Sequence, residues 1–201
     1  MPDLCFKGER TYVHGTSLYE AVLQGAEVTG FGAPDGPLSV DFRRRLVSGA
    51  RLHYHDAAGA PAAPEDAVTG FNLRCGTRVV RGWVEPTSTV VTRRIPYDEA
   101  LIRTATAIDG ETIRMIGAPP FQPFEICAAM AVHLHNTLFP PPPGERWMLT
   151  QVKLERPLTE ADLSGLTLAF QRRLGERVTR TGVAVPEQPS LGTLTFMLTR
   201  L

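Results

Sequence analysis

Two apolar segments, each entered through a turn, constrain most strongly what this chain of 201 residues can fold into. In the first, HGTSLYEAVLQ (residues 14–24), a His-Gly turn leads into a pattern that predicts a helix over residues 16–28. The inward face of this helix is expected to carry Leu18, Ala21, Val22, Gly25 and Val28. In the second, GAPPFQPFEICAAMAV (residues 117–132), a Gly/Pro turn precedes a helix predicted over residues 123–138, with Pro at its first position. This helix is apolar on nearly every face, so we expect it to be buried on most sides.

Strand-like runs follow each helical segment. Leu38, Val40 and Phe42 alternate in LSVDFRRRL (residues 38–46), as in a half-buried strand. Further strands are predicted near residues 50–56, 68–84, 87–95, 147–154, 166–174, 176–185 and 191–201. Residues 97–117 are predicted to be extended, with a turn at Asp109-Gly110. Each half therefore contains a turn, one buried helix and three or four strands, which indicates an α+β fold.

Short identities between the halves favour a duplication. A similar turn occurs in GERT (residues 8–11) and GET (residues 110–112), and similar strands, VDFRRRL (residues 40–46) and VKLERPL (residues 152–158), follow the two helices. We therefore predict two halves, residues 1–98 and 99–201, each a helix wrapped by an antiparallel sheet. A helix wrapped in this way is the hot-dog arrangement, and the whole chain is predicted to be a double hot-dog.

Composition excludes several classes of function. Basic and acidic residues both number 21, so no net field favours nucleic acid or an anionic membrane. The three cysteines, Cys5, Cys75 and Cys127, are scattered, which favours a reducing cytoplasm over a disulfide scaffold or a zinc site. No apolar run reaches the roughly 20 residues that a membrane span needs, and the N-terminus lacks the features of a signal peptide. We expect a cytoplasmic protein with no nucleic-acid partner and no membrane association.

The helical segments resemble the 3-hydroxyacyl-acyl-carrier-protein dehydratases of the hot-dog superfamily. In that family a His-Phe-Pro-Gly turn leads through Pro-Gly into a helix carrying Glu-Ala-Met-Ala-Gln. The segment RMIGAPPFQPFEICAAMAV (residues 114–132) has in register Gly117, Pro119, Phe121 and Ala129-Met130-Ala131. In the first half, Gly15 takes the place of the glycine, and EAVLQ (residues 20–24) resembles the helix motif.

The departures from the family pattern concern its chemistry. The catalytic histidine of the family falls on Arg114 in the second half and near Cys5 in the first. The helix carboxylate falls on Ala128 in the second half but is kept as Glu20 in the first. In the family, histidine removes the α-proton and the carboxylate protonates the leaving hydroxyl. One half therefore resembles an inactive copy, with Arg114 filling the unused pocket, and the other keeps the acid without the usual base.

The hot-dog fold implies a place for a thioester at the start of the first helix. Free amides and the positive end of the helix dipole point there into the acyl tunnel, where they stabilise charge on a thioester oxygen. We assign this role to Gly15, Thr16 and Gln24. His14 is the candidate base in a new position, and the alternative is a turn histidine bonded to backbone. Glu20 is the candidate acid, and the alternative is a capping box with Ser17 in the pattern S-x-x-E.

Other polar residues have structural alternatives of the same kind. Arg43 and Arg45, in an arginine run placed on a strand, are candidate ligands for the phosphates of coenzyme A or phosphopantetheine, or belong to a solvated sheet face. Cys5 is a candidate thiol nucleophile or a small apolar residue. His53 and His55 face one side of a strand without a carboxylate companion except Asp56 on the other side, so no metal site is predicted.

Three functions remain open from the sequence. The first is a dehydratase-like lyase acting on 3-hydroxyacyl thioesters through Glu20 and His14. The second is an acyl-thioester hydrolase, since hot-dog thioesterases commonly lack the histidine and use a helix carboxylate. The third is a non-catalytic subunit that binds an acyl chain or carrier protein. Each implies acyl-CoA or acyl carrier protein as the partner, no cofactor of its own, and a homodimer or a hetero-oligomer with another hot-dog subunit.

Overall fold

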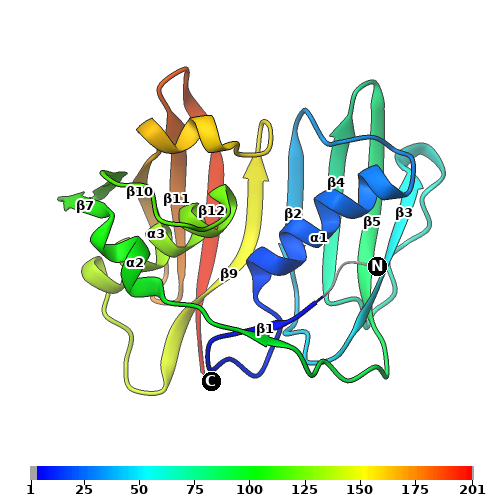
Figure 1. Ribbon diagram of the computed structural model, residues 1–201, viewed down its shortest axis with the longest axis horizontal. Helices are drawn as coiled ribbons and strands as arrows, with labels where there is room; N and C mark the ends of the chain where they lie inside the picture. The colour runs from blue at the N-terminus through cyan, green and yellow to red at the C-terminus, as the bar shows by residue number, and fades with distance from the viewer. Residues whose placement is uncertain (1–3, 201) are drawn as a thin grey trace. The chain divides into compact units, whose positions relative to one another are not determined.

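The computed structural model describes residues 4–200 as two compact units. One unit comprises the described residues through Tyr97 together with Glu155–Pro157, and the other comprises Asp98–Leu154 together with the residues from Leu158 onward. Each unit contains one long helix and an antiparallel sheet (Figure 1). Between residues 4 and 200, the helices are all too short or too polar to traverse a lipid bilayer.

The first unit packs one helix against a four-stranded sheet. In Figure 1, α1 (Gly15–Val28) lies across one face of the sheet. The strands are β2 (Leu38–Phe42), β3 (Ala50–Asp56), β4 (Thr69–Cys75) and β5 (Arg78–Pro86). They are antiparallel and hydrogen-bonded in the order β3-β5-β4-β2. A short parallel pair, β1 (Phe6–Lys7) with β6 (Arg94–Ile95), joins the two ends of this stretch of chain, and a 3-10 turn, η1 (Ala57–Gly59), follows β3.

The predicted first helix is confirmed to within one residue, and most of its inward face is as predicted. Its most buried apolar residues, each at most 2% exposed, are Leu18, Tyr19, Ala21, Val22 and Ala26. Val28 is 84% exposed, so its assignment to the core was wrong. It is the last residue of α1, and the helical period identifies a face without showing where the supporting structure beneath that face ends.

Gly25 is required where α1 approaches β3. The Tyr54 hydroxyl donates to the carbonyl oxygens of Val22 (3.0 Å) and Ala21 (3.3 Å) and so occupies the space beside Gly25. A Cβ atom at Gly25 would lie 1.9 Å from the Tyr54 hydroxyl oxygen. Burial raises the pKa of the Tyr54 phenol, which keeps the hydroxyl protonated as a donor. This contact fixes the helix against the edge strand of the sheet.

Replacing Gly25 by alanine is therefore expected to destabilise the protein, although alanine is the better helix former. We expect a loss of about 1–3 kcal/mol in the free energy of unfolding, because the methyl group overpacks against Tyr54. Urea denaturation measures this loss. The matched control is Gly59→Ala, since a Cβ atom there meets nothing within 4 Å. A Gly25→Ala variant as stable as the parent would contradict this packing.

The second unit packs its long helix, α3 (Pro123–Leu138), against a six-stranded antiparallel sheet. The strands are β7 (Thr106–Asp109), β8 (Thr112–Met115), β9 (Glu145–Leu154), β10 (Thr167–Leu174), β11 (Val178–Val185) and β12 (Gln188–Arg200). Their order is β9-β12-β11-β10-β8-β7. The unit also contains α2 (Glu99–Thr104) and a 3-10 helix, η2 (Glu160–Gly165).

Two predictions of extended chain before α3 were wrong in part. Residues 99–104 form α2 rather than a strand, because the Asp98 side chain caps this helix by accepting from the Ala100 amide at 2.9 Å. The predicted turn at Asp109-Gly110 is confirmed between β7 and β8, with Gly110 at a φ of 55°. Of residues 87–95, only the two residues of β6 form a strand.

α3 spans the predicted residues and is buried on most sides, as predicted. Its residues with no exposed surface include Ile126, Cys127, Met130, Ala131, Leu134 and His135. The His135 imidazole lies with Nε2 2.7 Å from the Thr181 hydroxyl and Nδ1 3.5 Å from the Thr179 hydroxyl. The rings of Trp147 and Phe196 cover it, at centroid distances of 5.6 and 4.8 Å. Burial lowers the pKa of His135 to about 4, so the ring is neutral in the folded protein at neutral pH.

The buried imidazole makes stability depend on pH. The unfolded chain protonates His135 near pH 6.5, whereas the folded protein does so only near pH 4. Stability is therefore complete above about pH 6.5 and is lost as the pH falls towards 4, by roughly 2–3 kcal/mol between pH 7.5 and 4.5. His135→Gln should lack this component of the acid destabilisation in urea titrations at the two pH values. Parallel losses in the parent and the variant would refute it. Burial and Arg103 also lower the pKa of the half-buried His133, so His133→Gln is a comparison for a less buried ring.

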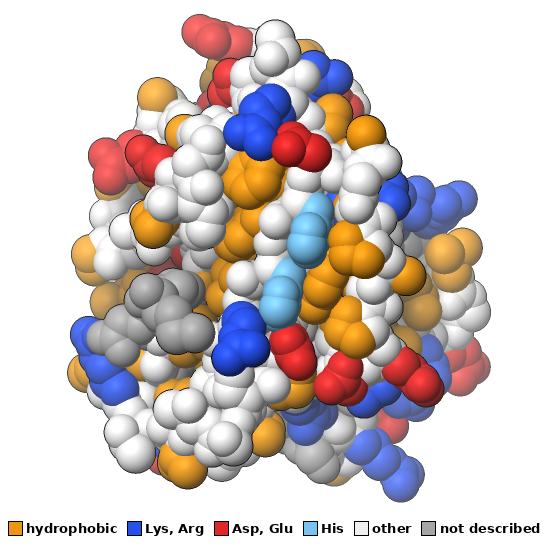
Figure 2. Space-filling view, turned by 90° about the vertical axis from the view of Figure 1, so that its right-hand side faces the viewer, with side chains coloured by type: hydrophobic (Ala, Val, Ile, Leu, Met, Phe, Trp, Pro, Cys, Tyr) orange, Lys and Arg blue, Asp and Glu red, His pale blue; other side chains and the backbone are white. Residues whose placement is uncertain are grey.

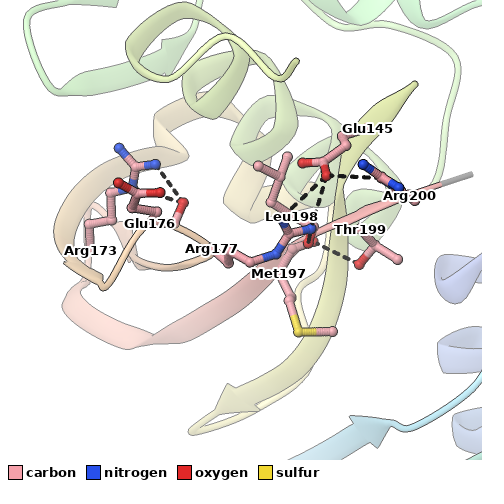
Figure 3. A network of polar contacts seen from close by, with 8 residues as sticks. All are labelled: Glu145, Arg173, Glu176, Arg177, Met197, Leu198, Thr199 and Arg200. Atoms are coloured by element: carbon pink, nitrogen blue, oxygen red, sulfur yellow. Dashed lines mark hydrogen bonds and ion pairs between the residues drawn. The ribbon is translucent and has the colours of Figure 1, made fainter. Parts of the chain in front are cut away.

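A network of ion pairs ties the ends of β9 and β12 (Figure 3). Arg177, in the turn between β10 and β11, donates to Glu145 at 3.3 Å from both terminal nitrogens and to the Leu198 carbonyl at 2.7 Å. Arg200 approaches the same Glu145 oxygen at 3.7 Å. Since Glu145 begins β9 and Leu198 lies near the end of β12, the network holds these strand ends in register.

The chain has the predicted α+β double hot-dog fold, with one long helix packed on each sheet. In both units the helix is followed by four antiparallel strands, but the order of the strands differs. Starting from the first strand after the helix, the order is β2-β4-β5-β3 in one unit and β9-β12-β11-β10 in the other. The long connection at residues 57–68 carries the chain past β5 to β4. The halves repeat a general plan without repeating their strand order.

Candidate active site

The first turn of α1 presents backbone donors beside polar side chains. His14 is the N-cap residue, and its carbonyl oxygen accepts from the amides of Ser17 (2.9 Å) and Leu18 (3.2 Å). The amides of Gly15 and Thr16 lie at the end of the helix, where the first N–H groups have no partner within the helix. The positive end of the helix dipole is at the same place. This is the location that the sequence predicted for binding a thioester oxygen.

A buried polar cluster flanks this helix start. Thr16 is 1% exposed, and its hydroxyl oxygen lies 2.7 Å from His14 Nδ1. Lys7, on β1 and 8% exposed, donates from Nζ to the same oxygen at 3.4 Å. His14 itself is half-buried. The sequence identified His14 and Thr16, but it gave no signal for Lys7, whose neighbour Phe6 forms a bridge with Val13 just before His14.

Three basic side chains surround the ring of Tyr97 next to this cluster. The Lys7 ammonium lies 5.5 Å from the ring centroid and the Arg10 guanidinium 5.1 Å from it. The His14 ring is 5.8 Å away and tilted by 45°. Cations over an aromatic face are stabilised by its negative potential. The Lys7 and Arg10 side chains thus bring two positive charges near the helix start, and these stabilise a negative charge that develops nearby.

The sheet beneath the helix start carries a buried hydroxyl group. The Phe42 ring lies 3.6 Å from the position of a Cβ atom on Gly15, so Phe42 faces α1 as predicted. Thr69 pairs with Phe42 across the strands and therefore shares its face of the sheet. Thr69 has no exposed surface, and within residues 4–200 its hydroxyl has no hydrogen-bond partner. A buried hydroxyl without a partner is costly, which is a feature of functional sites.

Glu20 lies on the same side of α1 as Thr16, one turn further along the helix. Its side chain is half-buried. The alternative reading of Ser17 and Glu20 as a capping box was wrong, because the helix begins at Gly15 and the N-cap is His14. Ser17 therefore occupies the first turn rather than the cap. Gln24 follows another turn later and is exposed, so it lies outside the cluster at the helix start.

The arginine run does not lie on a strand, since β2 ends at Phe42. Arg43 is exposed, and its guanidinium lies 3.2 Å from where a Cβ atom of Gly70 would be. Because Gly70 and Phe71 are consecutive on β4, Arg43 lies on the opposite face of the sheet from the side chains that meet α1. Arg45 is half-buried over the Tyr12 ring, at 5.4 Å. The role of Arg43 and Arg45 in binding phosphates stays a prediction.

The corresponding positions of the second half carry different side chains. Arg114 on β8 is exposed, so it does not fill a buried pocket as predicted. Ala128 is buried in α3. Glu125, which sequence reasoning missed, is a carboxylate in the first turn of α3 and only 5% exposed. Its position two residues after the Pro123 that opens the helix was the available signal. Cys5, the residue near the expected histidine in the first half, is buried.

A second histidine cluster lies on the face of the first sheet away from α1. His53 Nε2 is 2.7 Å from a Glu85 carboxylate oxygen, and the rings of His53 and His55 stack on Trp83 at 4.9 and 5.0 Å. Figure 2 shows two histidine side chains next to each other on this side of the molecule. The expectation that His53 lacks a carboxylate companion was wrong, because Glu85 comes from the neighbouring strand. No group of three or more His, Cys, Asp or Glu residues between 4 and 200 is arranged to hold a metal ion.

The position of the N-cap leads to a test with an internal control. Because Ser17 is not a cap, Ser17→Ala should change the free energy of unfolding by less than about 0.5 kcal/mol. A true capping box exists at η2, where the Thr159 amide and hydroxyl donate to Asp162 Oδ2 at 2.7 and 2.9 Å. Thr159→Ala should therefore cost about 1 kcal/mol. Urea titrations of both variants measure the difference, and an equal or larger loss for Ser17→Ala would restore the capping box at α1.

No protein-family model matches the chain, and no curated protein sequence matches it. Comparison with solved structures finds similar proteins of low sequence identity. The tesB protein of Mycobacterium avium subs paratuberculosis is 13% identical with a TM-score of 0.46, and the match covers 94% of this chain and 88% of that one. The dehydratase domain from the CurJ module of curacin polyketide synthase is 8% identical with a TM-score of 0.48, over 96% and 85% of the two chains.

A hot dog fold protein from Alicyclobacillus acidocaldarius, described as a conserved protein of unknown function, is 9% identical with a TM-score of 0.45. This match covers 95% of the present chain and 88% of the other. At such identities a likeness concerns the fold alone. The assignment of site residues rests on the geometry at the start of α1.

Proposed function

We propose that this protein processes acyl thioesters at the start of α1, as a dehydratase-like lyase acting on 3-hydroxyacyl thioesters. The observation that carries the proposal is the half-buried carboxylate of Glu20, one turn after the terminal amides of α1 and on the side of Thr16. A carboxylate and a set of backbone donors within one helical turn are the two groups that enolate chemistry requires. The positive charge of Lys7 and Arg10 beside them supports the same chemistry.

The reaction can be written with Glu20 as the single proton carrier. The carboxylate takes the α-proton of the 3-hydroxyacyl thioester, and the electron pair moves onto the thioester oxygen. The amides of Gly15 and Thr16 stabilise the resulting enolate. As the electron pair returns to form the α,β double bond, the carbon–oxygen bond of the hydroxyl breaks and Glu20 returns the proton to it. The products are an enoyl thioester and water, and Glu20 is ionised again.

Hydrolysis is the second candidate, and one observation favours it. It needs only one carboxylate, and α1 carries one half-buried carboxylate, Glu20, while Glu27 further along the helix is exposed. Glu20 takes a proton from water as the water oxygen attacks the carbonyl carbon. The same amide donors stabilise the tetrahedral oxyanion, and the thiol leaves with the proton.

Spectrophotometric assays distinguish the two reactions. With 3-hydroxyacyl-CoA substrates, absorbance of the conjugated enoyl product reports dehydration, and a thiol reagent reports release of free CoA. We expect enoyl formation, with kcat lower by about 10²- to 10⁴-fold in Glu20→Gln. Glu27→Gln is the matched control on the same helix and should retain full activity. Glu125→Gln tests the second half in the same way. A loss of activity in Glu125→Gln but not in Glu20→Gln would assign the reaction to the start of α3.

The remaining outcomes assign the other functions. Thiol release without enoyl formation identifies a hydrolase. If neither product forms but an acyl-CoA or acyl carrier protein binds saturably, the protein is a binding subunit. A second hot-dog subunit that co-purifies with it would then be the catalytic partner. Turnover that is unchanged in both Glu20→Gln and Glu125→Gln would reject the proposed site.

A further inference from the structure

The Thr16 hydroxyl group connects a buried cation to an imidazole. Its oxygen accepts a hydrogen bond from Lys7 Nζ at 3.4 Å and lies 2.7 Å from His14 Nδ1. Lys7 is 8% exposed and Thr16 1% exposed, so both groups are removed from solvent. An ammonium group has three donors and no acceptor, so the direction of the first hydrogen bond is fixed. Lys7 therefore uses one of the two acceptor sites of the Thr16 hydroxyl.

The proton of the Thr16 hydroxyl then determines the state of His14. Within residues 4–200, the hydrogen bonds of this hydroxyl are those to Lys7 and His14. Since Lys7 cannot accept, His14 Nδ1 is the acceptor that remains for the hydroxyl proton. A buried hydroxyl whose proton has no acceptor is costly. The hydroxyl therefore donates to Nδ1, and Nδ1 must carry a lone pair.

We infer that Lys7 is a positioning residue that acts through Thr16 to hold His14 as a neutral imidazole with its proton on Nε2. Two nearby cations and the helix dipole favour the same state. Lys7 and Arg10 both lie over the Tyr97 ring that His14 also contacts, and the positive end of the α1 dipole is adjacent. A protonated imidazole would add a third positive charge there, and its Nδ1–H would leave the Thr16 proton without an acceptor.

The assignment of the His14 tautomer deepens the proposed function, and what it means for catalysis rests on that function. An imidazole with its proton on Nε2 has no lone pair at that nitrogen. His14 Nε2 can therefore only donate a hydrogen bond. It is then not the base that the sequence predicted. In the elimination written above, His14 donates to an oxygen of the substrate, and the α-proton goes to Glu20. Lys7 positions His14 through Thr16, and its charge also favours negative charge at the start of α1.

Nitrogen chemical shifts of histidine-labelled protein test the inference without any substrate. In long-range ¹H–¹⁵N correlation spectra at pH 7.5, protonated and unprotonated ring nitrogens are well separated, and the His14→Gln variant identifies the His14 signals. We expect a protonated Nε2 and an unprotonated Nδ1 for His14, in at least about a tenfold excess over the other tautomer. A predominant Nδ1–H tautomer, or a doubly protonated ring, would overturn the inference.

Variants of the two partners separate a positioning role from a merely structural one. Thr16→Val and Lys7→Met should both shift the His14 signals towards a mixture of tautomers, whereas Thr16→Ser should restore the single tautomer. Lys153→Met, an exposed lysine on β9, is the matched control and should change nothing. A folded Lys7→Met protein with an unchanged His14 spectrum would remove Lys7 from the assignment. If that variant does not fold, the wild-type spectrum and the Thr16 pair still decide the tautomer.

The spectra and the activity assays fail independently. A protein with the Nε2–H tautomer but no turnover of any acyl thioester contradicts the proposed function and leaves the inference standing. An active protein whose His14 is protonated on Nδ1 contradicts the inference and leaves the acyl-thioester function standing.

Discussion

A helix that is buried on most sides must satisfy its polar groups inside the protein, because water does not reach them. At both long helices of this chain, a histidine lies 2.7 Å from a threonine hydroxyl. At α1 the pair is His14 and Thr16, and at α3 it is His135 and Thr181. The recurrence is not a repeated sequence motif. In the first pair the two residues are two positions apart, and in the second they come from α3 and β11.

The surroundings of the two pairs give them different chemical consequences. His135 lies among aromatic rings in the core of its unit, with no exposed surface, and burial lowers its pKa to about 4. Such a group contributes to stability and has no access to a substrate. His14 lies half-buried at the start of a helix, beside a lysine, and its hydroxyl partner is itself hydrogen-bonded to that lysine. Position relative to the helix end, rather than residue type, therefore separates the structural histidine from the functional candidate.

The sequence predicted the elements that are determined by local periodicity and turns. The bounds of α3, the start of α1 to within a residue and the turn at Gly110 follow from proline, glycine and apolar spacing. Predictions failed where a short pattern had two readings. Ser17-x-x-Glu20 matched the pattern of a capping box. The N-cap residue is His14, three positions earlier, so Ser17 and Glu20 both lie within the helix. Lys7 was not assigned, because its contact with Thr16 depends on a bridge between Phe6 and Val13 that no local pattern in the sequence marks.

The charge around the start of α1 limits which reactions this place can support. Terminal amides, Lys7 and Arg10 all stabilise negative charge on a bound oxygen and oppose a positive charge there. Elimination and hydrolysis of a thioester both develop negative charge on the carbonyl oxygen, so both are compatible with this end of the helix. They differ in the atom from which the base takes its proton, the α-carbon or water. Because a neutral His14 protonated on Nε2 cannot take either proton, the proposed function makes the choice between the two reactions depend on what the Glu20 carboxylate meets when a thioester is bound.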